Sequence, residues 1–184
     1  MDDPGQADLI RRSQDGDAQA FRGLIDTYKN TLFGVAYLMA RNRGMAEDAL
    51  QEGLVQIWKH LPSLRDPTRI KPWLIQIVVN EVKQQFRKKQ VPSVPIEAAD
   101  TACDGNPPEE LAMSEERRRL IKQALSGLPQ EQREAVVLRF YSDLSVPEIA
   151  AATRTPEGTI KSRLSRAMAH LGATLQAEGL EVES

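Results

Sequence analysis

Residues 143–171 read DLSVPEIAAATRTPEGTIKSRLSRAMAHL, and this stretch decides the fold of the C-terminal part of the chain. Ser145 and Glu148 form an S-x-x-E pattern, which is typical of a capping box at the start of a helix. The 147–152 segment is short and alanine-rich, so another helix can approach it closely. These features predict a short helix with a well-defined start.

A turn and a second helix follow it. Thr155 is the expected N-cap of the second helix and Pro156 its first residue, where a missing N–H costs little. Apolar residues at helical spacing are expected to face inward: Ile160, Leu164, Met168 and Leu171. Polar residues remain for the exposed side: Lys161, Ser162, Arg163, Ser165 and Arg166. The pattern predicts a helix-turn-helix. Any two-helix hairpin can show this spacing, so the pattern alone leaves DNA binding and simple solvation both open.

The composition excludes several classes of protein. Cys103 is the only cysteine among 184 residues, and His60 and His170 have no cysteine beside them, so we expect neither a disulfide framework nor a metal site. The acidic N-terminus is unlike a signal peptide, and no apolar run approaches the roughly 20 residues of a membrane span. We expect a cytoplasmic protein without membrane insertion. It shows no nucleophile–base pair and no phosphate-binding glycine loop, so we expect no enzyme, catalytic residue or cofactor.

The net charge of −2 is unevenly distributed along the chain. Residues 1–90 carry 14 Lys and Arg against 11 Asp and Glu, and residues 117–184 carry 10 against 8. Residues 91–116 carry seven acidic groups and no Lys or Arg. Two mildly basic modules therefore flank an acidic segment, and both can supply positive potential for phosphate contacts.

Helical spacing of apolar residues recurs throughout both modules, and no alternating strand pattern interrupts it. Helices are expected over 6–19, interrupted at Asp15-Gly16-Asp17, and over 18–39, 45–61, 72–89, 108–126 and 130–141. Gly44 is the expected C-cap of the second helix, and Val136, Val137 and Phe140 are expected to pack inward. The proline-rich 91–108 segment predicts a linker, and 178–184 a frayed tail. We expect an all-α fold with a helical bundle over 1–90, a flexible acidic linker over 91–110 and a helix-turn-helix domain over 111–184.

Two helices of the first module carry distinctive polar faces. The 45–61 helix has a buried stripe of Leu50, Leu54, Ile57, Trp58 and Leu61. Its polar, mainly acidic strip comprises Glu47, Asp48, Gln51, Glu52 and Gln56. A solvated surface near a helix N-terminus is the simpler explanation of this strip, and docking of a basic partner is the alternative.

On the 72–89 helix, amide side chains are interleaved with cations. The polar face comprises Gln76, Asn80, Lys83, Gln84 and Arg87, and Lys88 and Lys89 extend its charge. Such a face can contact phosphates and base edges together. Because Glu81 is its only acid, we favour nucleic-acid binding here.

The order of these pieces resembles the extracytoplasmic-function (ECF) sigma factors. The family's first domain is matched by residues 20–89, with A-E-D-A-L-Q-E at 46–52 and W-L-x-x-I-x-x-N at 73–80. The second is matched by L-P-x-E-x-R-E-A-V-V-L-R at 128–139, S-x-x-E-I-A at 145–150 and G-T-I-K-S-R-L-x-R-A at 158–167. The chain departs from the family pattern at Met45, Gly53, Lys71-Pro72 and the 77–79 run.

The resemblance implies a non-catalytic subunit that gives bacterial RNA polymerase promoter specificity and promotes DNA melting. It implies that the acidic strip docks on a coiled coil of the largest polymerase subunit, with a further contact to the flap of the second-largest subunit. It also implies an anti-sigma partner, and a linker that follows the path of the emerging RNA. The loop before the fourth helix, 64–71, would hold an unstacked base.

The resemblance also implies which residues contact promoter DNA. The −10 element would be engaged by Trp73, Gln76, Asn80, Lys83, Gln84, Arg87 and Lys88. The −35 element would be contacted in the major groove by Arg154, Thr155, Glu157, Gly158, Thr159, Lys161, Ser162, Arg163 and Arg166.

Two alternatives remain at the level of the sequence. A helix-turn-helix regulator that acts without core polymerase should carry a ligand pocket or dimer interface in its first domain, where this chain has an acidic strip and a second basic helix. A helical adaptor would bind partners but would direct no transcription.

Overall fold

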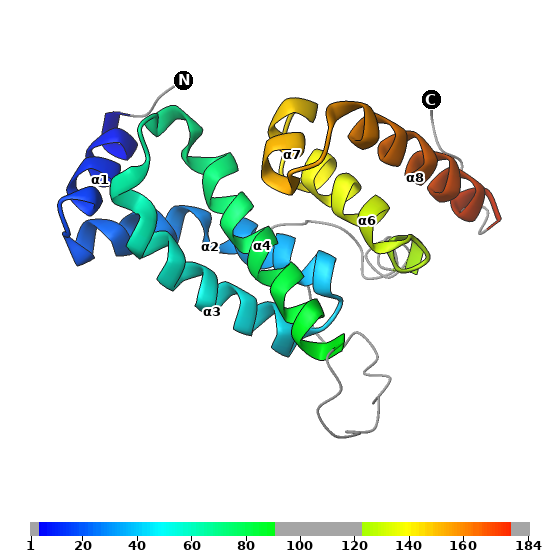
Figure 1. Ribbon diagram of the computed structural model, residues 1–184, viewed down its shortest axis with the longest axis horizontal. Helices are drawn as coiled ribbons and strands as arrows, with labels where there is room; N and C mark the ends of the chain where they lie inside the picture. Colours follow the sequence, from blue (N-terminus) through cyan, green and yellow to red (C-terminus); the bar gives the residue numbers. More distant parts are fainter. Residues whose placement is uncertain (1–3, 91–122, 178–184) are drawn as a thin grey trace. The chain divides into compact units, whose positions relative to one another are not determined.

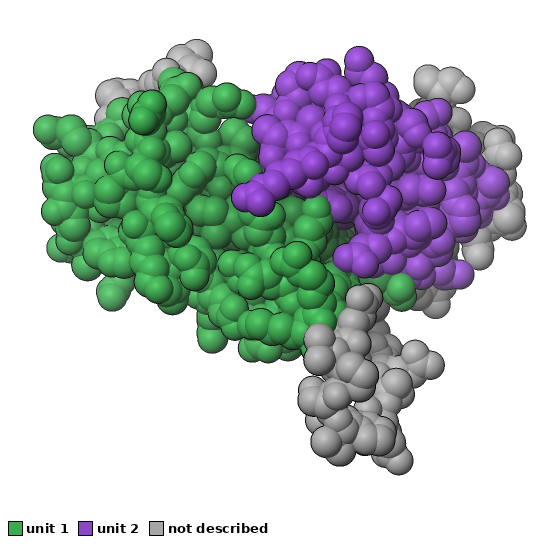
Figure 2. All heavy atoms as spheres, viewed as in Figure 1, with its two compact units in different colours: residues 1–105 green, residues 106–184 purple. Residues whose placement is uncertain are grey.

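The computed structural model describes residues 4–90 and 123–177. The chain divides into two compact units, residues 1–105 and 106–184 (Figure 2). Every regular element in the described ranges is helical. The expected linker over 91–108, most of the helix expected over 108–126 and the tail over 178–184 lie outside the described residues. The domain boundaries expected at 90 and 110 therefore stay predictions.

The first unit is a bundle of helices α1 (Pro4–Gln14), α2 (Ala18–Ala40), α3 (Arg43–His60) and α4 (Ile70–Gln90), in which α2, α3 and α4 contact one another and α1 packs on α2 (Figure 1). Two 3-10 turns, η1 (Leu61–Ser63) and η2 (Pro67–Arg69), connect α3 to α4. The core contains fully buried aliphatic side chains from these helices, among them Leu24, Leu32, Val35, Ile57, Leu74 and Val78. No helix in the described part of the chain has the length and apolar character needed to cross a bilayer.

A polar side chain sets the boundary between the first two helices. α1 ends at Gln14, since Asp17 caps α2 by accepting hydrogen bonds from the backbone N–H groups of Gln19 and Ala20. These bonds, together with the Arg12 guanidinium 2.7 Å away, hold the pKa of Asp17 below its usual value. The interruption expected at Asp15–Asp17 is therefore confirmed, and it ends α1 at Gln14.

The second helix does not end at glycine. Its C-cap is Arg41, which adopts the left-handed conformation with φ 57°. Asn42 then caps α3 through a 2.8 Å bond from the backbone N–H of Met45. α3 therefore begins at Arg43, and the expected C-cap Gly44 lies inside it.

The fourth helix begins two residues before the expected start. Asp66 accepts a hydrogen bond from the backbone N–H of Thr68 and initiates the η2 turn, which leads directly into α4 at Ile70. Pro72 still lies in the first turn of α4, where backbone N–H groups have no partner within the helix.

The buried face of α3 consists mainly of small residues. Ala46, Ala49 and Gly53 are buried together with Ile57, whereas Leu50 and Leu54 are half-buried. The Trp58 side chain is 37% exposed and packs edge-on against Phe21 with ring centroids 4.9 Å apart. Of the apolar stripe expected from the sequence, Ile57 and Leu61 are therefore buried as predicted, Leu50 and Leu54 lie at the edge of the interface, and Trp58 is not buried.

Gly53 allows α3 and α4 to approach closely. A Cβ atom at this position would lie 3.3 Å from Cγ2 of Val78, which is closer than an ordinary van der Waals contact. Glycine inside a helix lowers stability by about 1 kcal/mol relative to alanine. Its presence here is explained by the short distance between the two helices.

The second unit contains a helical segment over 123–126, α6 (Gln130–Val136), the π-helical turn η3 (Val137–Tyr141), α7 (Val146–Thr153) and α8 (Glu157–Ala177). α8 packs against both α6 and α7. The core of the second unit is formed by buried aliphatic side chains, among them Leu125, Leu128, Leu138, Leu144, Ile149 and Ile160.

Two residues expected in this core face solvent instead. Phe140 is 58% exposed, because the π turn inserts an extra residue into the helical register and brings Leu138 inward in its place. Met168 is 46% exposed, and Ala167 is buried instead. At 3.6 residues per turn, a residue eight positions after Ile160 is rotated by about 80° from it, whereas one seven positions later is rotated by about 20°.

Candidate functional site

The helix-turn-helix forms as the sequence predicts at its start. The backbone N–H of Ser145 donates to Oε2 of Glu148 at 2.8 Å, and the backbone N–H of Glu148 donates to Oγ of Ser145 at 3.4 Å. This reciprocal pair is a complete capping box. α7 ends at Thr153, and Arg154 turns the chain in the left-handed conformation with φ 54°.

The N-cap expected at Thr155 is shifted by one residue. α8 begins at Glu157, and the carbonyl of Pro156 accepts bonds from the N–H groups of Thr159 and Ile160. The Thr155 hydroxyl donates to the carbonyl of Thr153 instead, because the turn brings that carbonyl within 3.3 Å. Thr155 is therefore part of the turn between the helices.

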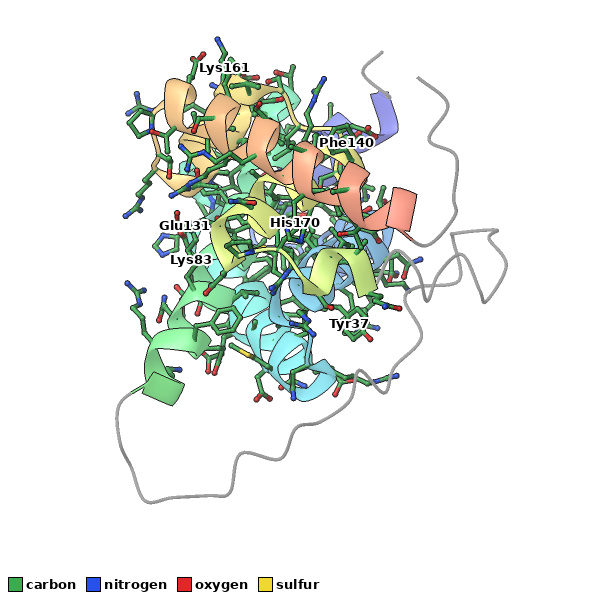
Figure 3. The ribbon with its side chains drawn as sticks, turned by 90° about the vertical axis from the view of Figure 1, so that its right-hand side faces the viewer. Tyr37, Lys83, Glu131, Phe140, Lys161 and His170 are labelled. Atoms are coloured by element: carbon green, nitrogen blue, oxygen red, sulfur yellow. The ribbon has the colours of Figure 1, made fainter. Side chains whose placement is uncertain are left out.

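Most of the residues expected at the −35 element are exposed at the start of α8. Lys161 points away from the ribbon of its unit (Figure 3). The other exposed members of the predicted set are Arg154, Glu157, Gly158, Thr159 and Arg166. Thr155, Ser162 and Arg163 are half-buried. The Nη2 atom of Arg163 lies 2.6 Å from Oε2 of Glu131 on α6.

The acidic strip on α3 is solvent-accessible. Glu47, Asp48, Gln51 and Glu52 are exposed, and Gln56 is half-buried. Glu47 is paired with Arg43 at 2.8 Å on the same helix. Glu52 is 3.3 Å from Nζ of Lys88 and accepts a 3.4 Å bond from Gln85, so the strip reaches α4.

The polar face of α4 becomes more exposed toward the end of the helix. Trp73, Gln76, Asn80, Lys83 and Gln84 are half-buried, whereas Arg87 and Lys88 are exposed. The cations at the C-terminal end are therefore accessible to a phosphate backbone.

Glu81 is not part of this face. Glu81 is 6% exposed and lies where α4 meets α3. Its Oε1 accepts a 3.3 Å hydrogen bond from Gln84. A Cβ atom on Gly53 would lie 3.9 Å from Cγ of Glu81, so the absence of a side chain there leaves room for the carboxylate. Burial, together with the charge of Glu52, raises the pKa of Glu81. The expectation that Glu81 is the acid of the exposed face was wrong.

Comparison with known proteins identifies the family. Residues 24–91 match the model of Sigma-70 region 2, and residues 118–171 match that of Sigma-70 region 4. The ECF RNA polymerase sigma-E factor of Escherichia coli is 33% identical over 171 residues, which are 86% of this chain and 88% of that protein. This chain belongs to the ECF family of RNA polymerase sigma factors. It is a promoter-specificity subunit of RNA polymerase.

Other relatives of this sigma factor agree with the assignment. The ECF RNA polymerase sigma factor SigW of Bacillus subtilis is 29% identical over 168 residues, 85% of this chain and 89% of that protein. The sigma factor RpoE of Bartonella quintana, solved in complex with the anti-sigma factor NepR, has a TM-score of 0.67 and 28% identity, covering 86% of this chain and 98% of its own. CnrH, solved with the cytosolic domain of CnrY, shares the fold with a TM-score of 0.68 at 23% identity, over 94% of this chain and 98% of its own.

The expected all-α fold of two helical domains and the family resemblance are thereby confirmed. Region 2 corresponds to α2–α4, which carry the acidic strip and the polar face of α4. Region 4 covers α6, η3, α7 and most of α8.

Sequence reasoning missed two side chains that organise the second unit of this sigma factor. Arg133 is buried; its Nε donates to the carbonyl of Leu125 at 3.0 Å and its Nη2 to that of Leu128 at 2.9 Å. Glu131, two residues earlier, forms an ion pair with Arg163. For Arg133 the available signal was the L-P-x-E-x-R pattern, because an arginine shortly after a helix end can bond the last carbonyl groups of that helix.

Proposed function

We propose that this sigma factor docks on core polymerase through the acidic strip of α3, contacts the −10 element with α4 and contacts the −35 element with α8. The observation that carries the proposal is the exposed polar start of α8, with Lys161 and Arg166 accessible next to the Arg154 turn. A helix presented in this way fits the major groove, where lysine and arginine can bond the edges of guanine bases and the phosphates that flank the groove.

The same proposal assigns the remaining parts of the chain. Residues 1–90 form the docking and −10 domain, residues 91–110 the linker along the RNA path, and residues 111–184 the −35 domain, which also contacts the flap of the second-largest subunit. We further propose that an anti-sigma protein restrains this factor, as NepR binds RpoE of Bartonella quintana. The factor itself catalyses no reaction and acts in the cytoplasm.

The direct test is transcription reconstituted from core polymerase and the purified factor. Promoters are first enriched from random DNA by the protein–core complex, and transcripts are then measured with and without the factor. Transcripts that require the factor and lose strength when either enriched element is scrambled support the proposal. Core-dependent transcription that ignores both elements would overturn it.

Glu52→Arg tests the docking strip separately. The substitution places a cation against a basic partner and also breaks the pair with Lys88. We expect a large loss of affinity for core polymerase, measured by fluorescence anisotropy. Asp26→Arg makes the same charge change on α2, where Asp26 is exposed and paired with Lys29, and it should leave core affinity close to that of the wild type. Equal losses in both variants would contradict docking through α3.

A further inference from the structure

Arg163 differs from the other cations of α8 because its side chain is mostly buried and bonds other residues of the same unit. Its side chain is 17% exposed, whereas Lys161 and Arg166 are exposed residues. Nη2 donates to Oε2 of Glu131 at 2.6 Å, and Nη1 lies 3.5 Å from Oγ1 of Thr155. The guanidinium is therefore mostly buried and bonded to other groups of the same unit.

The contacts of Arg163 connect three elements that determine the orientation of α8. Glu131 belongs to the first turn of α6, where the helix dipole favours a carboxylate. Thr155 belongs to the turn between α7 and α8, and its hydroxyl hydrogen is directed to Thr153, which leaves the oxygen to accept from Arg163. The planar guanidinium suits two such acceptors at once, which a lysine ammonium cannot reproduce in the same geometry.

The far end of this connection is itself anchored. α6 is tied to the preceding residues by Arg133, which bonds the carbonyls of Leu125 and Leu128. A change at Glu131 or Arg163 is therefore expected to affect the angle of α8 against a fixed α6.

We propose that Arg163 is a positioning residue of the recognition helix: it orients α8 through Glu131 and Thr155, so that Lys161 and Arg166 reach the bases of the −35 element. The proposal rests on the assignment of α8 to that element and changes the role that the sequence suggested for Arg163. To contact DNA directly, the guanidinium would have to give up a short, charge-assisted bond.

Glu131→Gln separates positioning from direct contact, because it weakens the bond to Arg163 and leaves every cation of α8 in place. The full-length protein is bound to core polymerase, and its affinity is compared for an enriched promoter fragment and for the same fragment with a scrambled −35 element. We expect the preference for the enriched fragment to fall about three- to tenfold, with an unchanged dependence on salt. A preserved or increased preference would overturn the proposal. It would mean that Arg163, once released from Glu131, contacts DNA directly.

A double-mutant cycle and a conservative variant provide an independent measure. If Arg163 acts through Glu131, the double variant Glu131→Gln/Arg163→Gln should lose no more preference than Arg163→Gln alone. Arg163→Lys keeps the charge but not the planar fork, so we expect it to lose preference as Arg163→Gln does. Additive losses in the cycle, or wild-type preference in the lysine variant, would indicate a phosphate contact and overturn the proposal.

Two controls distinguish the failure of this inference from the failure of the proposed function. Asp143→Asn removes an exposed acid of the same unit, and an effect equal to that of Glu131→Gln would overturn positioning. Lys161→Ala tests the assignment of α8 itself. If it keeps full preference, the proposed function of α8 fails; if it loses preference while Glu131→Gln does not, only the role of Arg163 fails. Glu131 is 69% exposed, so its amide variant should keep the fold, which thermal unfolding checks.

Discussion

Glu81 illustrates how a single residue can be misplaced by a pattern of charges. In the sequence it interrupts a run of amides and cations and therefore resembles the acid of a solvated face. In the fold it lies between α3 and α4, beside Glu52 and within reach of the charge of Lys88. Burial and the neighbouring carboxylate disfavour its ionised form, so this residue opposes folding when it is charged.

Glu81→Gln should therefore stabilise the protein at neutral pH. The pKa of Glu81 is raised in the folded state above its ordinary value of 4.5. The folded state then binds more protons than the unfolded state just above that value, and the free energy of unfolding decreases as the pH rises through this range. The amide variant avoids this loss and can still accept the bond from Gln84.

Thermal unfolding of both proteins between about pH 4 and about pH 8 measures this effect. The variant should have the higher Tm at the upper end, and the difference should shrink as the pH falls. Glu47→Gln, at an exposed position on α3, is the matched control and should not reproduce this trend. A wild-type Tm above that of the Glu81 variant at neutral pH would contradict the proposed cost of burial.

At the scale of elements, the α3–α4 contact depends on Gly53. Val78 is fully buried opposite it, and a β-branched side chain inside a helix has essentially one rotamer, so Val78 cannot move aside easily. Gly53→Leu should destabilise the protein by about 1–3 kcal/mol through overpacking. Gly53→Ala should be close to neutral, since a gain of about 1 kcal/mol in helix propensity offsets the tight contact. Urea unfolding compares the two, and equal stability of the leucine variant and the wild type would show that the helices separate without cost.

The start of α7 depends on the capping box. Ser145→Ala removes the acceptor for the N–H of Glu148 and the hydroxyl that bonds its carboxylate at 2.6 Å. We expect a loss of about 1 kcal/mol in the free energy of unfolding of the second unit. Ser145→Asp, which keeps an acceptor at the N-cap, should recover part of it. Identical unfolding curves for the alanine variant and the wild type would mean that the cap does not limit the stability of α7.

Elements whose determinants are local were predictable from the sequence, and contacts between distant residues were not. The capping box depends on Ser145 and Glu148, three positions apart, and it forms as predicted. The pair of Glu131 and Arg163 joins residues 32 positions apart, so no local pattern indicates it. Phe140 was misplaced because a π turn interrupts the helical period that the prediction assumed. Exposed positions such as Lys161 and Arg87 were predicted correctly because their exposure follows the regular spacing of a helix.

At the scale of the whole molecule, charge is distributed unevenly along the chain. Residues 1–90 and 117–184 each carry a small excess of Lys and Arg, whereas residues 91–116 hold seven acidic groups. The whole chain thus has a net charge of −2 although its proposed DNA-contacting helices expose cations. A polyanionic segment within the same chain is expected to repel DNA phosphate and to compete with it for those cations.

The acidic segment should therefore weaken DNA binding by the free protein. The triple variant Glu97→Gln, Asp100→Asn and Asp104→Asn raises the net charge from −2 to a positive value and leaves residues 1–90 and 117–184 unchanged. We expect the free variant to bind a promoter fragment several-fold more tightly than the wild type at about 50 mM salt, and the difference to narrow at about 200 mM as screening increases. Ser93→Ala with Thr101→Ala, two neutral changes in the same segment, should have no effect. Equal DNA affinities of the triple variant and the wild type at low salt would show that the segment does not oppose DNA binding, and the excess of acid would then require a partner other than DNA to explain it.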